Sequence, residues 1–435
     1  MPTPAAKQSL AKQWASTITS AAAKPLKHLR ASDLRAAAQL ATTATASVAR
    51  IAEGVNQAVW STLGAPSGKT ADQTRGITGL AFQSVQGITG LVGKGLDTAF
   101  AKLAPFIAPP DATHVPCATR EAVLAAINGV LGDHLAATGN ALATQMTLRF
   151  DGSALNWQAM PPKTKVTGKV LLLVHGLCMN DLQWRNAHAA GTAGARVVDH
   201  GATLAAALGY TPVYLRYNTG LHTSINGREL SEQLAQLVQH WPKRISDLTI
   251  VVHSMGGLVT RSAVHTAQAT QAAWIKKLKN IVFLGTPHHG AVLEKAGNWV
   301  DIILGSTPYS KPFAKIAQLR SAGITDLRYG HLVDADWVGK DRFRRQPDSR
   351  QIVPLPAGVA CYTVAGTTAA QRSTLSDRLV GDGLVTLPSA LGQHTDASRS
   401  LMFAKAAQRI VYRTNHMQLL SSDEVGAQLV DWLGR

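Results

Sequence analysis

The chain has 435 residues, which is enough for one large domain and an additional module. Hydrophobic residues make up 46% and charged residues 16%, which excludes an intrinsically disordered chain and indicates a packed core. The formal net charge of +17 favours attraction to anionic membranes, polyanions or acidic inclusions, although a positive excess that serves only solvation is the alternative. No zinc-finger spacing or aromatic-flanked basic motif accompanies this charge, so nucleic acid is not the expected partner.

Ala-rich helical patterns fill roughly residues 5–105, and the pentapeptide GITGL occurs there twice, at 76–80 and 87–91. The offset of eleven residues is about three helical turns, so both copies face the same way. Polar side chains interrupt the uncharged stretch around these repeats, which favours helix packing or an interfacial helix over a membrane span. A proline-rich linker at 104–117 follows. We therefore expect a helical N-terminal module and linker over 1–116, and a second domain over 117–435.

Three cysteines, Cys117, Cys178 and Cys361, are too few and too widely spaced for a disulfide framework or a metal cluster. The first residues contain no apolar run of signal-peptide length. A reducing, cytoplasmic location is therefore expected, with peripheral association at a membrane or inclusion surface as an extension of it.

From Lys169 onward, strand-like and helix-like segments alternate. A helix over 119–137 and short strands at 146–150 and 154–157 precede them. The predicted strands are mostly continuous apolar runs, as expected for a parallel sheet that is covered on both faces. The fold class predicted is α/β, with right-handed crossovers and ligands at the carboxyl ends of the strands. The predicted strands are 169–176, 212–218, 248–254, 280–285, 359–366 and 409–413, and the predicted helices are 202–209, 228–241, 258–267 and 423–433.

Residues 291–350 interrupt this alternation and carry several aromatic residues, followed by the basic cluster KDRFRRQ. Insertions of this kind after a core strand often act as lids over apolar substrates. A structural excursion without a lid function is the alternative.

The decapeptide TIVVHSMGGL, residues 249–258, marks the end of a predicted strand and the start of a helix. A tight turn at that junction would expose the hydroxyl of Ser254 at the top of the sheet, beside a helix N-terminus. Gly256 and Gly257 leave room for a strained turn, whereas Val252 places a bulky side chain where a small residue is usual. Ser254 is therefore the candidate nucleophile.

A serine hydroxyl needs a base that removes its proton, and the base needs an acid that orients it. His416 follows the last predicted strand and is the candidate base, whereas His394 fits a solvated loop residue better. Asp382 lies between two glycines in GDGLV, a turn that can direct a carboxylate, and Asp377 is the second candidate acid.

An oxyanion hole requires two backbone N–H donors. We predict that Met255, directly after the nucleophile, supplies one. The segment HGLCMND after the first central strand supplies the other, from Leu177, and Gly176 lets the chain approach the substrate. Cys178 fits buried packing better than nucleophilic chemistry.

The heptapeptide LGTPHHG, residues 284–290, contains two histidines after the fourth predicted parallel strand. A metal site would need further ligands, and none stands at a suitable spacing, so no metal and no cofactor are predicted. We expect the segment to line the site instead. The predicted substrate-binding residues are His175, Gly176, His253, Pro287 and His288.

The motifs HGL, HSMGG, GTPHHG, DGLV and the final NH resemble those of the lipase and esterase branch of the α/β-hydrolases. The resemblance extends to bacterial triacylglycerol lipases and to the lipase-like domain of GPI inositol-deacylases, and it covers about residues 165–435. It implies an α/β-hydrolase fold with Ser254, Asp382 and His416 as the triad. Many bacterial lipases of this type carry a calcium-binding aspartate two residues after the catalytic histidine. Gln418 stands there instead, so calcium is not predicted.

The leading functional hypothesis is a serine ester hydrolase that cleaves carboxylic esters with an apolar acyl chain, at a lipid or polyester surface. Two alternatives remain open: an acyltransferase that uses the same triad, and a non-catalytic scaffold that binds a partner through its N-terminal helices. The pattern leaves the oligomeric state open.

Overall fold

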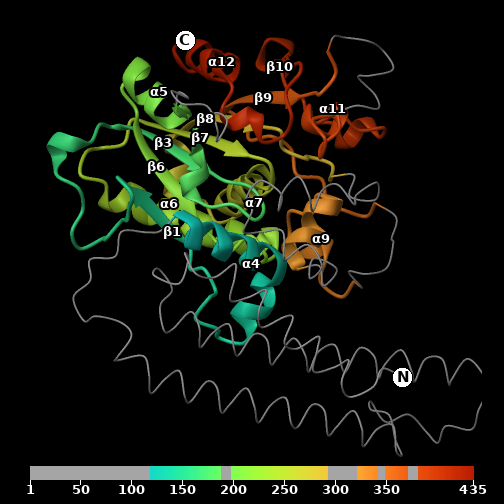
Figure 1. Ribbon diagram of the computed structural model, residues 1–435, viewed down its shortest axis with the longest axis horizontal. Helices are drawn as coiled ribbons and strands as arrows, with labels where there is room; N and C mark the ends of the chain where they lie inside the picture. The colour runs from blue at the N-terminus through green and yellow to red at the C-terminus, as the bar shows by residue number, and fades with distance from the viewer. Residues whose placement is uncertain (1–117, 188–196, 292–320, 341–347, 371–380) are drawn as a thin grey trace, which may run out of the picture. The chain divides into compact units, whose positions relative to one another are not determined.

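The computed structural model describes residues 118–187, 197–291, 321–340, 348–370 and 381–435 (Figure 1). The predicted N-terminal module and both GITGL repeats lie outside these residues, as does most of the predicted insertion at 291–350. Within the part that is described, no helix combines the length and hydropathy that a membrane span requires.

An eight-stranded sheet forms the centre of the described chain, in the order β10-β9-β8-β7-β3-β6-β1-β2. Neighbouring strands from β10 to β6 are parallel, and β1 pairs in antiparallel fashion with both β6 and β2. The predicted, mostly parallel α/β sheet is therefore confirmed. The strands are β1 Thr147–Phe150, β2 Ser153–Ala154, β3 Lys169–Val174, β6 Thr211–Arg216, β7 Asp247–His253, β8 Leu278–Leu284, β9 Ala360–Gly366 and β10 Gln408–Val411; β4 Arg185–Ala187 and β5 Val197–Asp199 form a separate pair.

Helices cover both faces of the sheet, as Figure 1 shows for α5 and α12 on one side and α6 and α7 on the other. Alternate residues of β3 explain this arrangement, because Val170, Leu172 and Val174 pack with α6 and α7. Leu171 and Leu173 pack with α5 and α12. The helices are α4 Ala118–Ala137, α5 His200–Leu208, α6 Thr223–His240, α7 Met255–Ala269, α9 Ala322–Tyr329, α11 Leu387–Ala390 and α12 Asp423–Leu433.

Most predicted elements appear within a few residues of their expected bounds, but three differences are informative. The predicted strand at 154–157 contributes only the end of β2. Helix α6 begins at Thr223, five residues before its predicted start. Its first residues are buried but polar, so no apolar stripe marks them as helical in the sequence. In that first turn, a Cβ on Gly227 would lie 2.5 Å from the Cβ of Ser262, so glycine allows α6 to approach α7 closely. Helix α9, inside the predicted insertion, was not predicted.

The carboxyl ends of the parallel strands lie at one edge of the sheet, since Val174, Val252 and Phe283 are register neighbours on β3, β7 and β8. The loops that follow these strands carry the motifs HGLCMND, SMGG and GTPHHG. The topology therefore gathers the predicted site at this edge.

Candidate active site

Ser254 is the residue that joins β7 to α7, and its backbone is strained. Its φ of 54° and ψ of −126° lie in a region that side-chain-bearing residues rarely adopt. Its amide donates to the carbonyl oxygen of Leu284 at 2.9 Å, which connects the turn to the end of β8. A Cβ on Gly256 would lie 2.7 Å from the carbonyl oxygen of His175, so the turn after Ser254 requires glycine.

Val252, the departure from the usual pattern, does not relax this turn. Its side chain is fully buried in the cluster that covers one face of the sheet, with Val174 and Phe283 beside it in register. The side chains beside Val252 in the sheet therefore include the large ring of Phe283. The strain at Ser254 is present despite this valine.

His416 and Asp382 form a buried pair. The Nδ1 of His416 lies 2.6 Å from Oδ2 of Asp382, and the two side chains are 2% and 1% exposed. The carboxylate is held in turn by the amides of Leu384 and Val385, which donate to its Oδ1 at 3.0 and 2.8 Å. Because a carboxylate only accepts, Nδ1 carries the proton and Nε2 presents its lone pair. That Nε2 is buried and has no hydrogen-bond partner within the described residues.

Two contacts bring this pair to the loop of Ser254. The ring of His253, the residue before Ser254, places Nε2 3.0 Å from the carbonyl oxygen of His416. The two imidazole rings lie 4.6 Å apart between centroids. Gly285 directly follows the acceptor of the Ser254 amide, and a Cβ there would lie 3.2 Å from both Asp382 Oδ2 and His416 Cε1. The loops that carry Ser254, Asp382 and His416 therefore converge around the end of β8, and no hydrogen bond joins Ser254 to the His416 Nε2.

The two predicted oxyanion donors lie on either side of this turn. Met255 is the first residue of α7, so its N–H has no intrahelical partner. No hydrogen bond engages the N–H of Leu177 within the described residues. The two loops touch, because a Cβ on Gly176 would lie 2.9 Å from the Cβ of Ser254.

His175, at the start of the loop that carries Gly176 and Leu177, is held in place by Tyr217. Its ring stacks on Tyr217 at 4.5 Å, and the Tyr217 hydroxyl donates to the His175 carbonyl at 2.9 Å. Burial lowers the pKa of His175 to about 4, and burial also holds the pKa of His253 well below its usual value. Both rings are therefore neutral at pH 7 and serve as packing and hydrogen-bonding groups.

The remaining predicted residues lie further along the GTPHHG loop. The side chain of His288 is 1% exposed and packs against Phe283 and Phe403 at ring distances of 4.8 and 5.4 Å. Burial and the neighbouring Arg261 hold its pKa well below the usual range. The substrate-binding roles of Pro287 and His288 stay predictions.

His394, the alternative base, is not part of this arrangement. The Nε2 of His394 lies 3.5 Å from Oδ2 of Asp348, and the Nδ1 of His394 accepts from the amide of Asp396. Asp377 lies outside the described residues.

The sequence interpretation missed two supporting residues. Gly285, at φ 56°, is needed because any Cβ would press on Asp382, His416 and Leu419; the signal was a glycine placed directly after a buried strand. Thr219 fixes the loop that carries Leu177, since its Oγ1 accepts from the amide of Cys178, a residue with φ 58°. Its signal was its position just after β6, at the carboxyl edge of the sheet.

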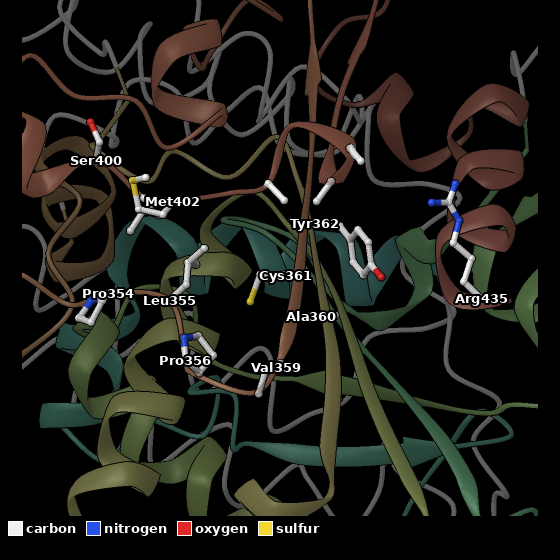
Figure 2. A pocket seen from close by; sticks show the side chains of 14 residues that line it. Pro354, Leu355, Pro356, Val359, Ala360, Cys361, Tyr362, Ser400, Met402 and Arg435 are labelled. Atoms are coloured by element: carbon white, nitrogen blue, oxygen red, sulfur yellow. The ribbon is translucent and has the colours of Figure 1, made fainter.

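A cavity of about 570 Å³ lies elsewhere, at the amino end of β9. Figure 2 shows the side chains of Leu355, Cys361 and Met402 around it. Ser254 follows the carboxyl end of β7, and ligands of parallel sheets bind at the carboxyl ends of the strands. This cavity lies at an amino end instead, so it is not the expected substrate site.

No group of three or more His, Cys, Asp or Glu side chains is arranged to hold a metal in the part of the chain that is described. Gln418, at the position of the calcium-binding aspartate, exchanges hydrogen bonds with Asn415. Its Oε1 accepts from the Asn415 amide at 2.8 Å, and its own amide donates to the Asn415 side chain at 2.9 Å. A neutral amide thus closes the loop that carries His416.

Residues 165–352 match the protein family described as PGAP1-like alpha/beta domain. A search of curated proteins found no significant match. Among solved structures, the mature lipase BlEst2 of Bacillus licheniformis is 18% identical, with 66% of this chain and 98% of that chain covered and a TM-score of 0.39. The esterase Pf2001 of Pyrococcus furiosus is 13% identical, with 62% and 82% covered and a TM-score of 0.34. The phospholipase PlaB of Legionella pneumophila is 13% identical, with 52% and 46% covered and a TM-score of 0.32. These likenesses are distant, and the fold assignment stands on the strand order and the family match.

Proposed function

We propose that the chain is a serine ester hydrolase with an α/β-hydrolase domain and that it works through an acyl-enzyme; the strand order and the family match support this. Ser254 Oγ attacks the ester carbonyl while His416 Nε2 takes its proton. Asp382 holds the His416 tautomer and stabilises the imidazolium. The N–H groups of Leu177 and Met255 bind the oxyanion. His416 then returns the proton to the leaving alcohol, and water releases the acid by the same steps.

The strained Ser254 turn is the observation that carries this proposal. Strain of this size persists only where the surroundings hold it, and it clusters at functional sites. Here it is held beside a His416–Asp382 pair whose Nε2 is left without a partner. A scaffold without catalytic activity would need neither the strain nor the unpartnered base.

The test is turnover of a chain-length series of nitrophenyl esters by the wild-type protein, Ser254→Ala and Ser398→Ala, an exposed serine of the same fold. We expect Ser254→Ala to lower kcat/KM by about a thousandfold or more, and Ser398→Ala to leave it unchanged. Equal turnover by the wild type and Ser254→Ala would refute the proposal. A competing alcohol in the same assay distinguishes hydrolysis from acyl transfer, because a transferase would yield the new ester as its main product.

We also propose that the substrate carries an apolar acyl chain and is presented at an anionic lipid or polyester surface within the cytoplasm. The support is the net charge of +17 and the likeness of the motifs to those of lipases. The full-length chain should co-sediment with vesicles that contain anionic phospholipid, and this binding should weaken as salt rises because surface charges are screened. Equal binding to neutral vesicles, or none to either kind, would contradict this proposal.

A further inference from the structure

A second polar cavity lies between α7, the GTPHHG loop and the segment 350–353. Its volume is about 20 Å³, and its lining includes Arg261, His288, His289, Arg350 and Arg399. It is rich in cationic side chains and, apart from the predicted substrate-binding role of His288, its lining has no part in the proposed ester hydrolysis.

Arg261 of α7 is the central side chain of this cavity. It is 5% exposed, and its Nη2 donates to the carbonyl oxygen of Val353. Within the described residues, its Nε and Nη1 are buried and have no hydrogen-bond partner. A buried guanidinium with unsatisfied N–H groups is unfavourable unless something accepts from them.

His288 also lines the cavity and adds a further donor. Neither of its ring nitrogens has a partner within the described residues, and the neutral ring carries one N–H and one acceptor nitrogen. The unpartnered donors of Arg261 and His288 therefore outnumber the single acceptor nitrogen that these two side chains leave over.

The carboxylates nearby are already engaged. Asp348 accepts two hydrogen bonds from the guanidinium of Arg350, at 2.8 and 2.7 Å. Asp336 accepts from the amides of Leu332, Val333 and Gln351. Burial first, and then the positive charge of Arg350, lower the pKa of Arg261 to about 9. The cavity is therefore a positive environment whose own anions do not neutralise Arg261.

We propose that this cavity binds a single monoatomic anion, chloride under ordinary conditions, through Arg261 and His288. The cavity has room for about one water-sized particle, which excludes sulfate and phosphate. Water fits less well than a halide, because water accepts at most two of these N–H groups and needs acceptors for its own two hydrogens. A halide accepts from all of the donors and requires no acceptor. The bound ion fixes the GTPHHG loop to α7.

The direct test is bromide, which replaces chloride and is located by its anomalous X-ray scattering in crystals of the wild-type protein. We expect a bromide peak between Arg261 and His288. A cavity that is empty or holds only water in bromide would overturn the proposal.

The second test is thermal unfolding at constant ionic strength, with chloride exchanged for gluconate, which is too large for the cavity. We expect the Tm of the wild-type protein to rise by about 4 °C when chloride is raised from about 1 to about 200 mM. Arg261→Gln should abolish the rise, whereas Arg228→Gln, a half-exposed arginine on α6, should keep it. A larger rise in sulfate than in chloride would contradict the proposal, because it is the order expected from general salt exclusion. Neither test depends on ester turnover.

Discussion

The strained backbone conformation of Ser254 is the single-residue feature that points most directly to the proposed function. Its left-handed φ costs about 1–3 kcal/mol relative to a relaxed residue. That conformation places the hydroxyl-bearing side chain between the end of β7 and the start of α7, where the loops after β3 and β8 also arrive. His253, the preceding residue, is as important, because its ring holds the main chain of His416.

The strain predicts an unusual order of stability between two inactive variants. Glycine adopts the Ser254 dihedrals without strain, whereas alanine does not. We expect Ser254→Gly to be about 1 kcal/mol more stable than Ser254→Ala, although glycine normally weakens a folded chain. Urea unfolding of the two variants measures the difference. A glycine variant that is less stable than the alanine variant would show that the turn carries no strain.

At the scale of elements, the loop after β8 organises the site. The carbonyl oxygen of Leu284, which precedes this loop, accepts a hydrogen bond from the Ser254 amide. At Gly285 the chain then turns and lies directly against Asp382 and His416. The loops after β7, β9 and β10 are therefore coupled through a glycine that follows β8 and takes no part in the chemistry itself.

Gly285→Ala tests this coupling. The new methyl group would press on the Asp382–His416 pair, and we expect kcat to fall by about 10- to 100-fold. Gly209→Ala is the matched control, because Gly209 also has a positive φ of 73° but nothing within 4 Å of its added Cβ. The control should lose stability and keep its kcat in nitrophenyl ester turnover. Equal kcat values for the two variants would contradict the coupling.

The sequence was sufficient to predict the central strands, because β3, β7 and β8 are continuous apolar runs next to glycine-rich turns. It was also sufficient to propose Ser254, Asp382 and His416, because their order along the chain and their positions after predicted strands can be read from the sequence. The start of α6 and the whole of α9 were not predictable in this way, since their buried polar residues make contacts that are remote in sequence. Asp326 of α9, for example, accepts from the Thr223 amide at 2.8 Å and lies 3.0 Å from the His222 ring.

At the scale of the whole molecule, the described core buries an unusual set of neutral histidines. Burial lowers the pKa of His175, His200, His253, His288 and His289. Each of these rings would take up a proton in the unfolded chain at a pH where the folded chain excludes it. The fold should therefore lose stability in mild acid.

The pKa shift of His175 gives the magnitude of the stability lost in mild acid for one of these rings. Its pKa falls from 6.5 to about 4, so the unfolded chain binds its proton below pH 6.5 while the folded chain stays neutral down to about pH 4. We expect this ring alone to lower the free energy of unfolding by about 2 kcal/mol between pH 7 and pH 5. Urea unfolding at both pH values should show a smaller loss in His175→Asn than in the wild type. The same pH dependence in both proteins would contradict a neutral, buried His175.

A fluorophosphonate probe tests the central claim most directly, because it phosphonylates a serine only where a base and an oxyanion site activate the hydroxyl. Peptide mass spectrometry of the labelled full-length protein locates the adduct. We predict a single adduct on Ser254 in the wild type, no labelling of Ser254→Ala, and strongly slowed labelling of His416→Ala. An unlabelled Ser254 in a folded protein, or an adduct on another serine, would contradict the assignment of Ser254 as a catalytic nucleophile.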